Sequence, residues 1–314
     1  MGKILVTGGC GYVGKYLVSL LSEDYKVAVY DNITYEPHYL DEYEFYYGDI
    51  TDYDRYLEVL EEFKPDIVCS LAALVGDPCC QANPELAKEI NEDSVKWLCE
   101  NYKGKIIHLS TCSIFGINNN LITEDTKPNP ISVYAQTKLN SEKYVLDNGG
   151  LVLRLGTLYG KTSSRPRLDL VVNIFATMCA LGQDLIVTGK EAWRPLLHVK
   201  DVSHAIKNAI WRDLSGAYNL VDKNYQIGEI AQKVVDICGT GNIIYQNLPP
   251  QDLRNYKVDN TKCSSFFTPQ FSLEDGVLEI YKMVKENRIK SPFSPLYHNG
   301  KFAYEHLQRI SQSG

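Results

Sequence analysis

Short apolar runs alternate with stretches of helical periodicity over the first half of the chain. The apolar runs are continuous, which is typical of strands that are buried on both faces of a parallel sheet. They cover residues 3–7, 26–30, 45–47, 66–70, 105–110 and 151–154. Helical periodicity separates them at residues 14–21, 53–63, 84–102 and from residue 134 onward. This order predicts an α/β fold with a doubly wound parallel sheet.

The pattern loosens after residue 154. Two irregular stretches, 157–168 and 248–260, frame predicted helices at 169–181, 201–211 and 227–238. We therefore expect a first domain over residues 1–156 and a smaller C-terminal substrate-binding lobe over 157–286. Some segments of this lobe are expected to return to the main sheet. Residues 287–314 form a C-terminal extension with a possible short helix at 302–310.

Composition narrows the class of protein. The 314 residues are 44% hydrophobic and 23% charged, and the net charge of −7 argues against a nucleic-acid or membrane-surface partner. No apolar run approaches the ~18 residues of a membrane span. No signal peptide precedes the first strand, so we expect a cytoplasmic protein. The nine cysteines include no Cys-x-x-Cys, and the six histidines add no metal-ligand spacing, so we expect reduced thiols and no metal.

A glycine motif lies between the first strand and the first helix. Gly8, Gly11 and Gly14 follow the spacing Gly-x-x-Gly-x-x-Gly, with Tyr12 and Val13 inside it. Glycines there allow a tight turn and a close approach to a pyrophosphate, and the helix N-terminus offers N–H groups. The context predicts a Rossmann-type NAD-binding domain, and we expect all five residues to line the cofactor.

An acidic residue ends the second strand. The Asp31 carboxylate, beside Asn32, would accept hydrogen bonds from the adenosine ribose hydroxyls and repel a 2′-phosphate, which favours NAD over NADP. The alternative is that Asp31 only caps a turn with Asn32.

Two further segments follow strands at the same predicted edge. Asp49 and Ile50 come after the third strand and are positioned to reach the adenine. The segment Leu71, Ala72 and Ala73 follows the fourth strand. Its small alanines would let the chain pass close to the cofactor.

A tyrosine and a lysine one helical turn apart suggest the chemistry. Tyr134 and Lys138 share one helix face, and a nearby ammonium favours the phenolate. Thr111 ends the fifth strand, where a ligand binds in an open parallel sheet. We expect Thr111 to bond the reacting sugar oxygen, Tyr134 to take its proton, and Lys138 to lower the Tyr134 pKa and hold the cofactor ribose. The plain alternatives are strand-end hydroxyls and a surface helix pair.

Together these motifs resemble the extended short-chain dehydrogenase/reductases, in the branch of nucleotide-sugar epimerases and dehydratases. The resemblance extends to about residue 276, and some features are similar to UDP-glucose 4-epimerase-like and GDP-heptose 4-dehydrogenase-like members. It rests on residues 7–14, 31, 49–50, 71–73, 110–116, 134–138, 194–201 and 254–262.

The resemblance also marks a departure. In the family's 4,6-dehydratases an Asp-Glu pair follows the threonine and supplies the acid and base of water elimination. Here Cys112 and Ser113 stand in those places, which argues against a 4,6-dehydratase. We expect Cys112 to be a small packing residue.

The resemblance implies four substrate-binding residues besides Thr111. Arg194 and Arg254 lie in segments similar to the family's pyrophosphate-binding stretches, and arginine suits bidentate phosphate contacts. Thr157 matches a sugar-contacting position that often holds Asn, and Asn173 is expected to contact the diphosphate or the sugar.

The expected function is NAD-dependent oxidation at C4 of a nucleoside-diphosphate sugar. The enzyme would be a 4-epimerase or a 4-dehydrogenase in nucleotide-sugar biosynthesis for surface glycans, acting on a UDP- or GDP-sugar. The alternatives are a keto-sugar-nucleotide reductase and a non-catalytic NAD-binding regulatory protein on the same fold. A homodimer or higher homo-oligomer is expected.

Overall fold

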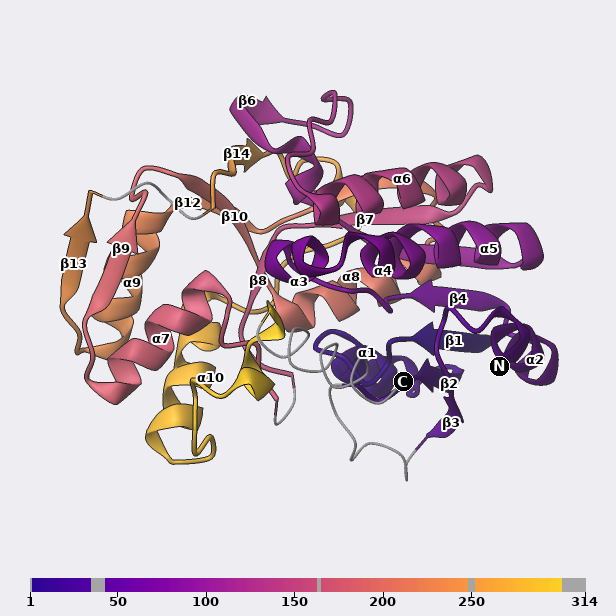
Figure 1. Cartoon of the computed structure of the whole chain (residues 1–314), viewed down its shortest axis with the longest axis horizontal. Coiled ribbons are helices and arrows are strands. Elements are labelled where there is room, and N and C mark those ends of the chain that lie inside the picture. The colour runs from indigo at the N-terminus through magenta and orange to yellow at the C-terminus, as the bar shows by residue number, and fades with distance from the viewer. Residues whose placement is uncertain (1, 35–42, 163–164, 248–251, 301–314) are drawn as a thin grey trace.

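A seven-stranded parallel sheet forms the main layer of the computed structural model, which describes residues 2–34, 43–162, 165–247 and 252–300 (Figure 1). The strand order is β11-β7-β5-β4-β1-β2-β3, and every neighbouring pair is parallel. The strands are β1 (Lys3–Thr7), β2 (Lys26–Asp31), β3 (Glu44–Tyr47), β4 (Ile67–Ser70), β5 (Lys105–Thr111), β7 (Leu151–Leu155) and β11 (Gly216–Leu220). The predicted α/β fold is confirmed.

Helices cover both faces of this sheet because its strands carry apolar side chains on both sides. Ile4 and Val6 pack with α1 (Gly14–Leu21) and α8 (Val199–Trp211) on one face. Leu5, between them in the strand, packs on the other face. The helices there are α2 (Tyr53–Phe63), α5 (Ser94–Asn101) and α6 (Val133–Asp147). No helix in the described ranges is long and apolar enough to cross a membrane.

The helix predicted over residues 84–102 is interrupted. It consists of α4 (Pro84–Lys88), a π-helical turn at Glu89–Asp93 and α5, and a short helix α3 (Asp77–Ala82) precedes it. The π-turn aims the fully buried Asn91 at the chain leaving β4: its amide accepts from the Leu74 nitrogen at 2.8 Å and donates to the Leu74 oxygen at 3.0 Å. A π-turn holds one residue more than an α-turn, and the hydrophobic periodicity of the sequence does not reveal this insertion.

The second lobe, whose helices and strands lie at the left of Figure 1, has its own buried core. Its helices are α7 (Val171–Leu181), α9 (Ile227–Cys238) and α10 (Leu273–Lys285). Its strands are β8 (Thr157–Tyr159), β9 (Leu185–Thr188), β10 (Trp193–His198), β12 (Lys223–Gln226) and β13 (Ile243–Gln246). The sheet β12-β10-β8 and the pair β13-β9 lie outside the main sheet, whereas β11 joins it.

Two predictions for the second lobe are corrected. The stretch 157–168, expected to be irregular, begins with β8, which pairs with β10 in parallel. The helix expected from residue 169 begins at Val171. Helix α10 was not predicted, although Ser272 and Asp275 form a capping box at its start.

A small parallel pair brings a distant segment to the end of β5. Strand β6 (Ile117–Ile122) follows the 3-10 turn Cys112–Phe115 and pairs with β14 (Asn255–Val258), so the stretch 248–260 is not wholly irregular. Residues 248–251 lie outside the described part of the chain, as does the helix expected at 302–310.

The described part of the C-terminal extension returns to the second lobe. The 3-10 turns Cys263–Ser265 and Pro295–Tyr297 flank α10. The Leu168 nitrogen donates to the Tyr297 oxygen at 2.9 Å, and the Asn299 nitrogen donates to Asp169 at 3.1 Å.

Candidate active site

The glycine loop between β1 and α1 packs tightly against the chain that leaves β4. Gly8 has φ +71°, and a Cβ there would lie 2.6 Å from the Ala72 nitrogen. A Cβ at Gly14 would lie 2.5 Å from the Gly8 oxygen, and the Gly11 nitrogen donates to that oxygen at 3.0 Å. The absence of side chains leaves a cradle of main-chain atoms in front of α1, which suits a pyrophosphate.

The side chains of Tyr12 and Val13 turn away from this cradle. The Tyr12 hydroxyl donates to the Gly160 oxygen at 2.5 Å and accepts from Asn173 at 3.3 Å, and burial raises the Tyr12 pKa. Val13 packs on the core beneath α1. The predicted cofactor contacts of both residues stay predictions, and the Tyr12 side chain ties the loop to the second lobe.

Asp31 holds the glycine loop in place. Its Oδ2 accepts from the Cys10 nitrogen at 2.9 Å and its Oδ1 accepts from the Ile33 nitrogen at 2.7 Å. Burial raises the Asp31 pKa, and these two hydrogen bonds oppose the rise. The carboxylate thus lies at the end of β2, beside the cradle, where the predicted contact with ribose hydroxyls requires it.

A surface depression next to Asp31 suits an adenine. Asn32 and Asp49 line it, and the Asn32 amide donates to Asp49 at 2.7 Å. The Ile50 side chain is buried in the core beneath α2, so a contact with the adenine would use its backbone and stays a prediction.

The segment after β4 forms the opposite side of the cofactor cradle. The Leu71 nitrogen donates to the Thr7 oxygen at 3.2 Å, and the Ala72 nitrogen reaches the Thr7 hydroxyl at 3.5 Å. Ala72 is the residue that a Cβ on Gly8 would strike, and half-buried Ala73 continues the segment. The cradle and Asp31 together fit NAD.

Helix α6 begins with the predicted catalytic tyrosine in its first turn. Ser132 caps the helix by accepting from the Ala135 nitrogen at 3.2 Å. Burial raises the Tyr134 pKa, whereas the charges of Arg167 and Arg254 oppose the rise. Within the described ranges the Tyr134 hydroxyl has no hydrogen-bond partner, so it is available to a substrate.

Lys138 contacts a histidine that the sequence analysis did not select. Its Nζ lies 3.1 Å from Nε2 of His108, whose Nδ1 lies 3.2 Å from the Ser70 hydroxyl. Burial lowers the Lys138 pKa to about 7. Burial and the Lys138 charge hold the His108 pKa well below its usual range. In the structure the Lys138 ammonium contacts His108. The expected lowering of the Tyr134 pKa by Lys138 therefore stays a prediction for the NAD-bound protein.

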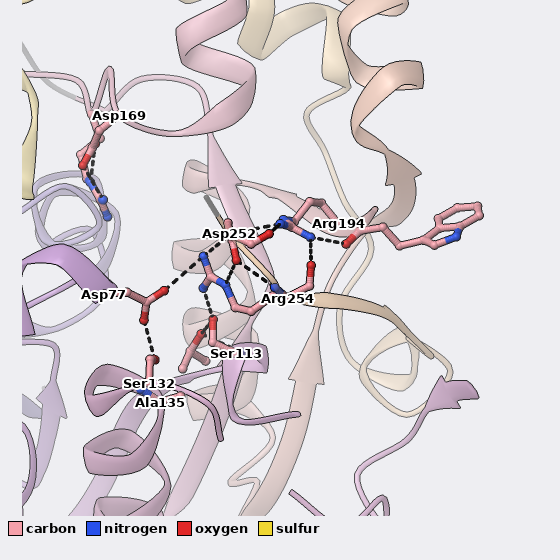
Figure 2. A network of polar contacts seen from close by, with 11 residues as sticks. Asp77, Ser113, Ser132, Ala135, Asp169, Arg194, Asp252 and Arg254 are labelled. Atoms are coloured by element: carbon pink, nitrogen blue, oxygen red, sulfur yellow. Dashed lines mark hydrogen bonds and ion pairs between the residues drawn. The ribbon is translucent and has the colours of Figure 1, made fainter. Parts of the chain in front are cut away.

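A network of charged side chains lies between β5, α3 and the segment before β14, as Figure 2 shows. Arg254 donates to both oxygens of Asp252 at 2.8 and 2.6 Å, and to the Ser113 hydroxyl at 2.6 Å. Its Nη2 also lies 3.4 Å from Asp77. The Ser113 oxygen lies 3.0 Å from the Thr111 hydroxyl at the end of β5. Arg254 and Thr111, which are 143 positions apart, therefore share one site.

Arg194 occupies a more structural position than predicted. It is 4% exposed and donates to the backbone oxygens of Arg254 and Trp193 at 2.5 and 2.8 Å. It also pairs with Asp252 at 3.0 Å. These contacts show that Arg194 anchors the segment that carries Arg254, and its predicted diphosphate contact stays a prediction.

The two other residues predicted to contact the substrate, Asn173 and Thr157, differ in their burial. Asn173 is fully buried, its amide oxygen accepts from the Gly160 nitrogen at 3.0 Å, and its amide nitrogen donates to the Arg167 oxygen at 2.7 Å. Its predicted substrate contact stays a prediction. Thr157 is half-buried on β8, opposite Leu196 of β10, and its predicted sugar contact stays a prediction.

The cysteine after Thr111 is a packing residue. Cys112 is fully buried, its thiol donates to the Arg154 oxygen at 3.2 Å, and burial raises its pKa. None of the nine cysteines, all of which lie in the described ranges, forms a disulfide bond.

Sequence reasoning missed five polar residues of this region. They are His108, Ser113, Asp77, Asp252 and Arg167. Ser113 carries a weak signal, because it follows Thr111 by two positions at a strand end. Asp252 precedes Arg254 by two positions, and Asp169 follows Arg167 by two, a spacing at which both structural pairs form.

The chain belongs to the NAD dependent epimerase/dehydratase family, whose model matches residues 4–221. A probable low-salt glycan biosynthesis reductase of Haloferax volcanii is 32% identical over 255 residues, which are 79% of this chain and 84% of that protein. A putative UDP-glucose 4-epimerase of Methanocaldococcus jannaschii is 26% identical over 90% of this chain and 99% of its own length.

Solved structures agree with the fold. The UDP-glucose 4-epimerase of Thermotoga maritima, with UDP-glucose, has a TM-score of 0.81 at 25% identity and covers 90% of this chain and 99% of its own. That of Thermus thermophilus, with NAD, has a TM-score of 0.79 at 24% identity, covering 91% and 99%. The resemblance and the NAD cofactor inferred from the sequence are confirmed, and the family supports an oxidoreductase-type enzyme.

Proposed function

We propose that the protein oxidises C4 of a nucleoside-diphosphate sugar with NAD, as a 4-epimerase or a 4-dehydrogenase in nucleotide-sugar biosynthesis for surface glycans. One observation carries the proposal. A continuous chain of contacts joins Thr111 through Ser113, Arg254 and Asp77 to Ser132, the cap of the helix that bears Tyr134. The hydroxyl at the end of β5 and the first turn of α6 are therefore linked across one site.

The residues have complementary tasks in this reaction. NAD, when bound, supplies the hydride acceptor. Tyr134 takes the proton from the C4 hydroxyl, and Thr111 holds the same oxygen by a hydrogen bond. Lys138, one turn along α6, offers a positive charge that favours the phenolate once its ammonium faces the tyrosine. Asp31 and the glycine loop hold the dinucleotide at the carboxyl edge of the sheet.

The polar groups around Thr111 argue against water elimination. A 4,6-dehydratase needs an acid and a base beside the sugar, and the two positions after Thr111 hold Cys112 and Ser113. The Cys112 thiol is buried with a raised pKa, and the Ser113 hydroxyl is hydrogen-bonded by Arg254. Neither supplies a carboxyl group. An epimerase would present the opposite face of the keto sugar, whereas a dehydrogenase would release it.

A reductase is the second candidate. The Haloferax volcanii relative is named a probable reductase and is 32% identical. The same residues serve that direction, because Tyr134 would then donate its proton to the C4 oxygen of a keto sugar. The UDP- or GDP-sugar substrate, the cytoplasmic location and the homo-oligomer remain part of the proposal.

The test is a panel of UDP-, GDP-, CDP- and dTDP-sugars incubated with NAD. NADH absorbance and products, analysed by mass spectrometry and NMR, distinguish epimerisation from net oxidation. A keto-acid acceptor releases a dehydrogenase that is stalled by bound NADH.

The variant Tyr134→Phe should keep NAD binding and lose turnover by orders of magnitude, whereas Tyr144→Phe, ten residues further along the same helix, should stay active. Equal turnover of the two variants would remove Tyr134 from the mechanism.

A further inference from the structure

We propose that Arg254 is a positioning residue for the catalytic hydroxyl of Thr111 and acts on it through Ser113. The segment that is expected to receive the substrate's phosphates would then also orient the hydroxyl that holds the reacting oxygen. This inference rests on the proposed function and goes beyond it, because it gives Arg254 a task in the chemical step.

The contacts form a short, buried line. The Arg254 Nη1 donates to the Ser113 oxygen at 2.6 Å, and the Ser113 and Thr111 oxygens lie 3.0 Å apart. The Ser113 backbone nitrogen also donates to the Thr111 hydroxyl oxygen at 3.1 Å. Ser113 is 4% exposed and Thr111 is 8% exposed, so water competes little for these bonds. Figure 2 shows the bond from the Arg254 guanidinium to Ser113.

The numbers of donors and acceptors on these groups limit which of them donates in each hydrogen bond. A guanidinium has donors only, so Arg254 always occupies a lone pair of the Ser113 oxygen. In the structure Thr111 donates to Ser113. The reverse bond, from Ser113 to Thr111, needs a small rotation of the Ser113 side chain, because the two oxygens already lie 3.0 Å apart.

The substrate decides which arrangement is used. When a sugar oxygen accepts from Thr111, the Ser113 proton turns toward Thr111. In that arrangement the Thr111 oxygen accepts from the Ser113 nitrogen, as it does in the structure, and from the reversed Ser113 hydroxyl, so both of its lone pairs are filled. Its remaining capacity is to donate, and it donates to the sugar. The positive charge at the start of the line strengthens each bond in turn.

Three other residues hold Arg254 in place. Asp252 holds the guanidinium through two bonds, and Arg194 donates to the Arg254 backbone oxygen at 2.5 Å. Asp77, 3.4 Å from Arg254, accepts from the Ser132 hydroxyl at 2.6 Å. The same guanidinium thus lies between the Thr111 line and the cap of α6.

The experiment is a double-mutant cycle on kcat and KM with the best sugar nucleotide of the panel. Ser113→Ala should lower kcat by about 10- to 100-fold, the worth of one hydrogen bond to a charged group, with KM and NAD affinity near those of the parent. Arg254→Gln should lower kcat similarly and also raise KM. The double variant should have the kcat of either single variant, because both changes break the same line.

The controls separate this idea from simpler ones. Ser203→Ala removes another fully buried hydroxyl, one with no partner among the described residues, and should leave kcat unchanged. Thermal melting of each variant shows that it is folded. If Arg254 only binds phosphate, Ser113→Ala keeps the parental kcat, or the two kcat losses multiply, and either result overturns the inference. Absence of turnover in the parent would instead refute the proposed function.

Discussion

Replacing Gly8 by alanine tests whether the glycine loop is shaped by its contact with the chain after β4. The left-handed backbone at φ +71° costs an alanine about 1–2 kcal/mol. The new Cβ would also lie 2.6 Å from the Ala72 nitrogen, well inside ordinary contact, and such overpacking costs roughly 1–3 kcal/mol more. We therefore expect the free energy of unfolding to fall by roughly 2–5 kcal/mol. The displaced loop should weaken NAD binding at least tenfold.

Gly182 provides a matched control. It has φ +67° at the end of α7, and a Cβ there would meet no atom within 4 Å. Gly182→Ala therefore carries the backbone cost alone, about 1–2 kcal/mol, and should bind NAD like the parent. Urea unfolding followed by tryptophan fluorescence gives the stabilities, and calorimetric titration gives the NAD affinities. If the two variants unfold at the same urea concentration and bind NAD equally, the contact with Ala72 does not shape the cofactor site.

Three other changes test the cofactor site, a buried ion pair and acid stability. Asp31→Ala should weaken NAD binding and reduce discrimination against NADP; an unchanged ratio of the two dissociation constants would exclude the ribose contact. Arg154→Met leaves the Glu142 carboxylate, 3% exposed, without its partner and should lower the free energy of unfolding by about 3–5 kcal/mol in a urea titration, whereas near-parental stability would contradict this. Burial alone would raise the Glu279 pKa. Hydrogen bonds from His198 and Lys200 outweigh this effect and lower the pKa to about 2. This carboxylate therefore stabilises the fold above its unfolded pKa of about 4.3, and the stability is lost as the pH falls toward 2. Glu279→Gln should flatten that acid limb in urea midpoints, and a parallel limb would refute the assignment.

The main sheet could be predicted because its strands are local signals. Residues 4–6 and 27–30, for example, bury side chains on both faces, so each is a continuous apolar run before any partner is known. Strand β6 is different. Its sequence Ile-Asn-Asn-Asn-Leu-Ile is mostly exposed and poor in strand formers. It forms by pairing with β14, more than 130 positions later, which a local pattern does not contain.

The candidate site divides in the same way. Tyr134 and Lys138 are set by spacing within one helix, and Gly8 by its place between a strand and a helix. Asp77 and His108 have no such signal, because their partners Arg254 and Lys138 come from other elements. Burial could not be predicted either, and burial is what makes Arg194 an anchor for its neighbours.

Because of the π-helical turn at Glu89–Asp93, the position of Asn91 depends on the number of residues in this helix as well as on their identity. A π-turn holds one residue more than an α-turn, so deleting one residue there would restore a regular helix. The helices on either side of the turn would keep nearly the same orientation, but the residues inside it, Asn91 among them, would be repositioned. Asn91 would then leave the Leu74 backbone, and the segment that faces Gly8 would lose its anchor. A shortening that gives a more regular helix would therefore loosen the cofactor cradle, so insertions and deletions are tolerated less here than the exposed helix surface suggests.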